Sequence, residues 1–293
     1  MRISIVIATR DRQDYLEHAL ASYEHQVGAP SFEIVVVDNG SSDDTKGVAE
    51  RANARGVVPV RYVYEAEPNR GKARNAGVKV AQGYVILFCD DDIVAPPGFV
   101  AAHEAAHSSA NLVVNGPILN VAGYDERPKP SPANMSRAFL CTCNVSVPKH
   151  ALDAVGGFDE DFKLYGWEDT ELGVRLREHG MRWSFAWDAY IWHIKPPTDN
   201  TLEVETRKAL ERARMARRFL EKSSSARVKM ATGAYGFNLF RGKYLLNDKV
   251  LAWMAGLAAS ENVPAPIRAI ARGQFLDGMY MQELVKTLED VSP

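Results

Sequence analysis

The first half of the chain alternates short, continuously apolar runs with longer helix-like stretches. The apolar runs span residues 3–8, 33–38, 60–64 and 84–89. The helix-like stretches between them span about 12–26, 43–55 and 70–81. A strand that is covered on both faces is apolar throughout, whereas a half-exposed strand alternates apolar and polar residues. The alternation therefore predicts an α/β fold with a mainly parallel, doubly wound, Rossmann-like sheet.

The second half of the chain has a different pattern. Residues 112–118, 138–147 and about 183–190 predict further strands. Residues 167–180 predict a helix that a glycine closes. From residue 202 onward the pattern is helical almost throughout, which predicts a helical C-terminal region.

Composition and charge exclude several classes of protein. Hydrophobic residues make up 46% of the chain and charged residues 25%, which is typical of a globular protein rather than a disordered one. The 35 Lys and Arg against 37 Asp and Glu leave a net charge of −2, so nucleic acid is not an expected partner. No apolar run reaches the ~18 residues of a membrane span, and no signal-peptide pattern precedes the first strand. Three cysteines without a CxxC pair favour reduced thiols and a cytoplasmic location.

Three consecutive carboxylates, Asp90, Asp91 and Asp92, follow the apolar run 84–89. Residues two apart in an extended chain share a face, so Asp90 and Asp92 are expected to point the same way. A hard divalent cation such as Mn²⁺ or Mg²⁺ would turn the repulsion between these carboxylates into attraction. A solvated acidic turn is the alternative interpretation of this segment.

A second acidic pair, Glu168 and Asp169, stands at the start of the helix predicted over 167–180. The helix dipole favours carboxylates in a first turn, which is sufficient reason for them. A general base that takes a proton from an alcohol also has to be a carboxylate or similar group within hydrogen-bond reach. Trp167 offers an apolar platform on which a sugar ring could stack.

Three weaker features follow other predicted elements. Asp38 ends the run 33–38, where it can accept a hydrogen bond from a base or ribose or close an Asx-turn. Residues 69–77 open a helix with three cations, and helix N-termini attract phosphate. His193 follows Trp192 just after a predicted strand and is an ordinary core histidine unless the fold brings it near Asp92.

The order of these features resembles that of the family 2 glycosyltransferases of the GT-A fold. The matching segments are Ala8-Thr9-Arg10, Asp38-Asn39-Gly40, Ala73-Arg74-Asn75, Asp90-Asp91-Asp92, Trp167-Glu168-Asp169 and His193. The resemblance covers about residues 1–195. It implies a nucleotide-sugar-binding half over residues 1–110, an acceptor-binding and catalytic half over 111–200, and a helical extension over 201–293.

The resemblance also implies a role for most residues of the donor site. The expected nucleoside-pocket residues are Thr9, Arg10 and Asp11. Asp38 is expected to contact the base, and Arg74 to lie beside the diphosphate and the acidic motif. Asp90 is expected to face the ribose. Asp91 fills the variable place of the motif and is counted with the donor site without a contact of its own.

For the reaction itself, the resemblance implies that Asp92 holds Mn²⁺ or Mg²⁺. His193 matches a late histidine that is a metal ligand in some members of the family. Asp169 is expected to act as the base, while Glu168 holds the acceptor beside Trp167.

The implied function is a metal-dependent, inverting transfer of a sugar from a nucleotide-diphosphate sugar, with UDP-sugars favoured. The acceptor would be a hydroxyl of a glycan, a lipid-linked saccharide, or another cell-surface or secondary-metabolite acceptor. One alternative is a nucleotidyltransferase that acts on a sugar phosphate, although residues 8–12 lack the glycine-rich loop that it needs. The other is a non-catalytic scaffold with the GT-A fold, although both acidic motifs are intact.

The helical third predicts no single partner. Residues 202–229 form a basic, amphipathic stretch, and aromatic residues follow up to residue 245. Such a stretch can lie on an anionic membrane, here the inner face, and would suit a lipid-linked acceptor. Packing on its own domain with a solvated basic face, or in a homodimer, are the alternatives.

Overall fold

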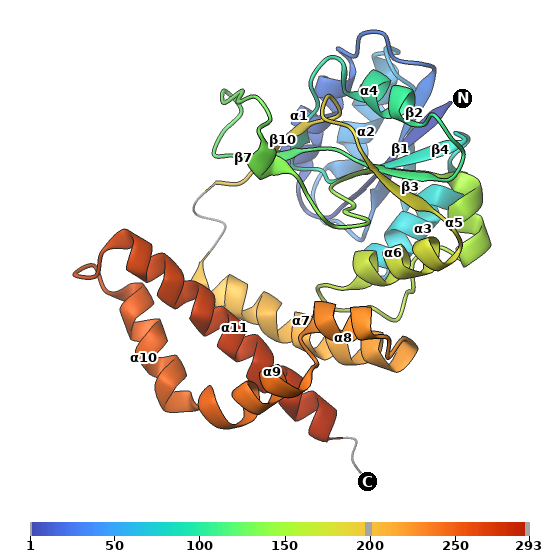
Figure 1. Cartoon of the computed structure of the whole chain (residues 1–293). Helices are drawn as coiled ribbons and strands as arrows, with labels where there is room; N and C mark the ends of the chain where they lie inside the picture. Colours follow the sequence, from blue (N-terminus) through green and yellow to red (C-terminus); the bar gives the residue numbers. More distant parts are fainter. Residues whose placement is uncertain (1, 197–200, 291–293) are drawn as a thin grey trace. The chain divides into compact units, whose positions relative to one another are not determined.

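The computed structural model describes residues 2–196 and 201–290, which form two compact units (Figure 1). The α/β unit comprises the chain up to residue 163 and again from residue 168 to 196. The helical unit comprises residues 164–167 and the chain from residue 201 onward. The expected domain boundary between residues 200 and 201 borders residues 197–200, which lie outside the described residues.

The α/β unit is built on a seven-stranded sheet with the order β3-β2-β1-β4-β8-β6-β9. Its strands are β1 (Ile3–Thr9), β2 (Phe32–Asp38), β3 (Val60–Tyr64), β4 (Val85–Cys89), β6 (Leu112–Asn115), β8 (Asn144–Pro148) and β9 (Arg182–Phe185). The pairs β1–β2, β1–β4, β2–β3 and β6–β9 are parallel, whereas β8 is antiparallel to β4 and β6. The predicted mainly parallel α/β sheet is therefore confirmed.

Helices cover both faces of this sheet (Figure 1). On one face lie α1 (Gln13–Tyr23), α2 (Thr45–Ala54) and α4 (Phe99–Ala106), and on the other α3 (Arg70–Val80), α5 (Lys149–Val155) and α6 (Glu168–Glu178). Ile5 and Ile7 of β1 pack with the first group, whereas Val6 packs with the second. Because successive residues of a strand face opposite sides, a strand between two helical layers is apolar throughout.

A smaller sheet with the order β5-β10-β7 lies in the same unit. Its strands are β5 (Ile93–Val94), β7 (Ile118–Val121) and β10 (Ile191–Ile194). β10 is antiparallel to β5 and parallel to β7, and a short 3₁₀ helix (Pro132–Asn134) follows in the Pro-rich loop after β7.

The strands of the second half differ from their predicted ranges. The single strand expected over 112–118 is two strands in different sheets, broken at Gly116, whose backbone lies against the carbonyl of Ala189 with no room for a side chain. The strand expected over 138–147 begins only at Asn144, and β9 ends at Phe185 rather than near residue 190. His193 lies inside β10, not after a strand.

The helical unit contains α7 (Leu202–Lys222), α8 (Ala226–Thr232), α9 (Gly236–Phe240), a π-helical turn (Arg241–Leu245), α10 (Asp248–Ala259) and α11 (Ala265–Glu289). The long helix α11 packs against both α7 and α10, which confirms the predicted helical C-terminal region. Ala213, Ala216 and Phe219 of α7 are buried. None of the helices in the described ranges is long and apolar enough to cross a membrane.

Candidate active site

The carboxyl ends of β1, β2 and β4 meet at one edge of the seven-stranded sheet. These strands are parallel, and their register pairs Thr9 with Asp38 and Ile7 with Cys89. The acidic motif starts directly after Cys89, at Asp90. The loops after all three strands therefore begin at the edge where open α/β sheets bind their ligands.

Asp38 is buried at this edge, and both of its carboxylate oxygens accept hydrogen bonds. The backbone N–H of Ser41 donates to Oδ1 (2.8 Å), and the hydroxyl of Tyr62 donates to Oδ2 (2.7 Å). The first bond closes the turn after β2 and spans three residues, whereas an Asx-turn bonds the backbone two residues on. Each carboxylate oxygen has a second lone pair and can accept one more hydrogen bond. The expected contact of Asp38 with a base stays a prediction.

Asp11 joins the loop after β1 to the loop after β2. Its Oδ1 accepts hydrogen bonds from the backbone N–H (2.6 Å) and the hydroxyl (2.9 Å) of Ser42, and these bonds lower the pKa of Asp11. The backbone of Asp11 is left-handed, with a φ of 52°. Arg10 is exposed, with Nε 3.5 Å from Oδ2 of Asp11. Nucleoside contacts by Arg10 and Asp11 stay predictions.

Arg12 lies against the acidic motif. Its Nη1 is 3.1 Å from Oδ1 of Asp91, and its Nη2 is 2.9 Å from Oδ2 of Asp92. The hydroxyl of Thr9 donates to Oδ2 of Asp91 at 2.6 Å. Asp91 is buried, and burial raises its pKa to about 7. Asp91 therefore fixes the loop after β1 to the acidic motif, a role that the sequence did not suggest.

Asp92 and His193 face each other across this edge. Nε2 of His193 is 3.1 Å from Oδ1 of Asp92, an oxygen for which no hydrogen-bond donor is present among the described residues. Nδ1 of His193 is 2.9 Å from Oδ1 of Asn120, an acceptor, so Nδ1 carries a hydrogen. A proton on Nε2 or a cation between the two atoms would make this contact attractive.

A divalent cation would have this effect, and the donor set fits one. The carboxylate oxygen suits Mn²⁺ and Mg²⁺, whose coordination a substrate phosphate can complete, and the imidazole nitrogen is a further ligand for a divalent ion. Asn120 orients the histidine ring, as outer hydrogen bonds do in metal sites. Burial alone would raise the pKa of Asp92, but His193 and Arg12 hold it below its usual value.

Arg74 connects the two acidic motifs. It is 8% exposed, and its Nη2 lies 3.6 Å from Oδ1 of Asp90. Its Nη1 lies 3.5 Å from Oε1 of Glu168 and 3.6 Å from Oδ1 of Asp169. Burial lowers the pKa of Arg74, but the three carboxylates around the guanidinium more than offset this and leave it raised. Burial also raises the pKa of Glu168.

Asp169 has one oxygen that is held by hydrogen bonds and one buried oxygen without a hydrogen-bond donor among the described residues. Oδ2 accepts hydrogen bonds from the backbone N–H (3.0 Å) and the hydroxyl (2.8 Å) of Thr142, in the turn before β8. Within the described part of the chain, Oδ1 has no hydrogen-bond donor and faces only Nη1 of Arg74. The carboxylate is thus fixed in orientation while one oxygen keeps its capacity to accept a proton.

Trp167 directly precedes the acidic pair and packs in the helical unit. Its Nε1 donates to the carbonyl of Arg212 (2.8 Å), the guanidinium of Arg212 lies 4.4 Å from the ring centroid, and Phe219 lies beside it. The φ of Trp167 is 73°, which is rare for a bulky residue. The indole is buried rather than presented as an open platform, and stacking of an acceptor on it stays a prediction.

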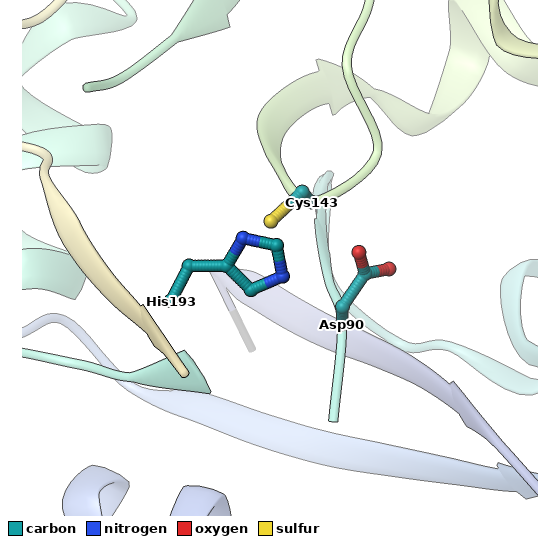
Figure 2. Close-up of side chains that lie close together, drawn as sticks. All are labelled: Asp90, Cys143 and His193. Carbon is teal, nitrogen blue, oxygen red and sulfur yellow. The ribbon is translucent and has the colours of Figure 1, made fainter. Parts of the chain in front are cut away.

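A thiol lies near the same edge. Ligand atoms of Asp90, Cys143 and His193 are all within 4.8 Å of one another. Figure 2 shows these three side chains approaching from three separate segments.

Sequence reasoning missed four residues of this site: Arg12, Asn120, Thr142 and Cys143. Charge balance could have found Arg12, because three adjacent carboxylates after one strand require a cation in a neighbouring loop. Asn120, Thr142 and Cys143 are brought to the site by strand pairing across the second half of the chain, which no local pattern marks.

Comparison with known proteins assigns the chain to a family. Residues 4–158 match the family described as glycosyl transferase family 2, and residues 126–197 match the N-terminal domain of galactosyltransferase. Validoxylamine A glucosyltransferase of Streptomyces hygroscopicus subsp. limoneus is 30% identical over 246 residues, which cover 69% of this chain and 53% of that protein. Chondroitin synthase of Escherichia coli is 24% identical over 241 residues, 67% of this chain and 35% of that one. The chain spans about half the length of the first of these relatives.

Solved structures share the fold. Mannosyltransferase PcManGT from Pyrobaculum calidifontis, in complex with GDP-Man and Mn²⁺, has a TM-score of 0.64 at 17% identity, over 99% of this chain and 88% of that one. S. aureus TarS 1-349, in complex with UDP, has a TM-score of 0.56 at 19% identity, over 99% and 91% of the two chains. These similarities confirm the expected GT-A fold. Since the family match takes in more than half of the chain, this protein belongs to glycosyl transferase family 2.

Proposed function

We propose that the chain transfers a sugar from a nucleotide-diphosphate sugar to an acceptor hydroxyl, with Asp169 as the base. One observation carries this proposal: Oδ1 of Asp169 has no hydrogen-bond donor among the described residues, while Arg74 joins the same carboxylate to Asp90 of the donor motif. A direct sugar transfer requires the base to lie close to the donor site, and here both contact the guanidinium of Arg74.

The donor site supplies charge stabilisation. A divalent cation held by Asp92 and Nε2 of His193 would neutralise the diphosphate and stabilise it as it leaves. Arg12 keeps Asp92 and Asp91 in position, and Arg74 lies beside Asp90. The likeness to a mannosyltransferase in complex with GDP-Man and Mn²⁺ and to TarS in complex with UDP supports a nucleotide-sugar donor and a divalent metal.

Asp169 takes the proton of the acceptor hydroxyl as that oxygen attacks the anomeric carbon. The new glycosidic bond forms while the bond from the anomeric carbon to the diphosphate oxygen breaks, and its electron pair leaves with the nucleoside diphosphate. Because attack comes from the face opposite the leaving group, the configuration at the anomeric carbon inverts. A positioned base contributes ~10²–10⁴-fold to such a rate.

A carbohydrate-like acceptor and a UDP-sugar donor are the first combination to test. Relatives are named for glucosyl transfer to validoxylamine A and for the synthesis of chondroitin and hyaluronan, and TarS was solved with UDP. The names of the three relatives fit a carbohydrate-like acceptor. A lipid-linked saccharide stays within the same chemical class.

The test compares Asp169→Asn with the wild-type chain in the presence of UDP-glucose and Mn²⁺. The UDP released is measured with water alone and with each of a panel of saccharide acceptors. We expect turnover to fall by ~10²–10⁴-fold while UDP binding, measured by calorimetry, stays within about threefold. Glu178→Gln, an exposed change at the far end of the same helix, is the matched control and should leave both unchanged. Equal loss of binding and turnover in Asp169→Asn would show that the carboxylate holds the site together instead.

A further inference from the structure

The structure assigns a thiol to the cation site: we propose that Cys143, with Asp90 and His193, forms a metal site that takes borderline-soft divalent ions such as Zn²⁺, Co²⁺ and Cd²⁺. The carboxylate oxygen, the sulfur and the ring nitrogen all lie within 4.8 Å of one another (Figure 2). A thiolate ligand binds such ions more strongly than oxygen ligands alone would.

Strand pairing brings the three side chains together. β4 and β8 are antiparallel and pair Cys89 with Asn144, so the next step of the ladder sets Asp90 opposite Cys143. β10 crosses beside them: the backbone N–H of Ile194 donates to the carbonyl of Asp92 (2.8 Å), and His193 pairs with Ile93 of β5. His193 thus lies within one backbone ladder, and Asp90 and Cys143 each lie one residue beyond the end of the other.

The geometry requires only small side-chain adjustments. In tetrahedral zinc coordination, with bonds of ~2.3 Å to sulfur and ~2.1 Å to nitrogen, neighbouring ligand atoms are about 3.5 Å apart. Rotations that move each ligand atom by about 1 Å reach that separation from 4.8 Å. Cys143 and His193 are buried, whereas the Asp90 side chain is 35% exposed, which leaves one side open for water or a substrate oxygen.

The chemistry of the ligands selects the metal. Thiolate and imidazole favour zinc-like ions, whereas carboxylates and water favour magnesium and manganese. As the sulfur–metal bond forms, the thiol proton leaves to the buffer, so binding consumes no other reactant. His193 belongs both to this cluster and to the Asp92 pair, so a soft ion and Mn²⁺ are expected to compete for it. Only this competition rests on the proposed function.

The test is a Co²⁺ titration of the whole, chelator-treated chain, followed by absorption. A thiolate ligand produces a sulfur-to-Co²⁺ charge-transfer band in the near ultraviolet. We expect this band in the wild-type chain, saturating at one ion per chain, and its loss in Cys143→Ser. Cys141→Ser, two residues away and outside the cluster, is the matched control and should keep the band. Changing a residue that only hydrogen-bonds to a metal ligand already lowers metal affinity by about tenfold or more. Because Cys143 is proposed as a ligand itself, Cys143→Ser should lower Zn²⁺ affinity by more than about tenfold, while Mn²⁺ affinity stays within about threefold.

The wild-type titration needs no variant and is decisive by itself. No charge-transfer band in the wild-type chain, or a band that disappears in Cys141→Ser and persists in Cys143→Ser, would overturn the inference. Its failure is distinguishable from failure of the proposed function. Mn²⁺-dependent UDP binding without a Co²⁺ band would support the proposed transferase and contradict the thiol site. A Co²⁺ band without nucleotide binding would support the thiol site and contradict the proposed transferase.

Discussion

Replacing Arg74 by Met removes the one cation that lies within 3.6 Å of Asp90, Glu168 and Asp169 in the described structure. Met keeps much of the volume and apolar character of the arginine stem, so the change acts mainly on charge. At an effective dielectric constant of about 20, unit charges 3.5 Å apart attract each other by about 5 kcal/mol. The change leaves the buried carboxylate of Glu168 without its counter-charge, and breaking a buried ion pair in this way costs about 3–5 kcal/mol in the free energy of unfolding.

The loss should depend on pH in a defined direction. Burial already raises the pKa of Glu168, and removal of the neighbouring positive charge raises it further. A carboxyl whose folded-state pKa lies above its unfolded-state pKa destabilises the fold above the folded value, and this effect disappears as pH falls through that value. The deficit of Arg74→Met is therefore expected to be larger at pH 8 than at pH 5.

Urea unfolding followed by tryptophan fluorescence at both pH values measures this directly. Lys79→Met removes an exposed cation from the same helix and should change the free energy of unfolding by less than about 0.5 kcal/mol. A loss below about 1 kcal/mol at pH 8 in Arg74→Met, or a deficit that grows as pH falls, would refute this account of the buried cation.

Three further predictions concern other parts of the chain. Burial lowers the pKa of His103 to about 3, so the stability that the neutral ring contributes is full above the unfolded-state pKa near 6.5 and is lost as pH falls. Between pH 7.5 and pH 5, the free energy of unfolding in urea should therefore fall by about 2 kcal/mol less in His103→Gln than in the wild-type chain. Equal decreases in the two proteins would contradict this. Trp167→Phe keeps a ring but loses the hydrogen bond to the Arg212 carbonyl, and should cost about 1 kcal/mol in thermal unfolding with UDP affinity unchanged, whereas weaker UDP binding would count against an anchoring role. Phe237 and Tyr244 of the helical unit are 68% and 60% exposed, so we expect cosedimentation with anionic but not neutral vesicles; pelleting that is independent of lipid would remove the proposed membrane contact.

The first half of the fold could be predicted from the sequence because its signals are local. Strands buried on both faces are apolar throughout, and the predicted range 3–8 falls within β1 (Ile3–Thr9), which is buried along nearly its whole length. Because the carboxyl ends of parallel strands meet at one edge of the sheet, Thr9, Asp38 and Asp90 could be placed at that edge without any long-range information.

The second half could not be predicted in the same way because its elements depend on tertiary contacts. The break between β6 and β7 follows from the close approach of Gly116 to Ala189, more than 70 positions further along the chain. Arg10 and Arg12 are both cations after β1, and only the folded chain shows that Arg12 contacts Asp91 and Asp92. No periodicity indicates that Trp167 packs in the helical unit, since its partner Arg212 lies in a separate helix.

The nucleotide-sugar donor can be tested by calorimetric titration of UDP, GDP, CDP and TDP into the chain, each with Mn²⁺ and with chelator. We expect that one of these nucleotides binds tightly in the presence of metal, and that binding is lost with chelator and in Asp92→Ala. Absence of binding by every nucleotide in both conditions would contradict the assignment of a nucleotide-sugar donor to this site.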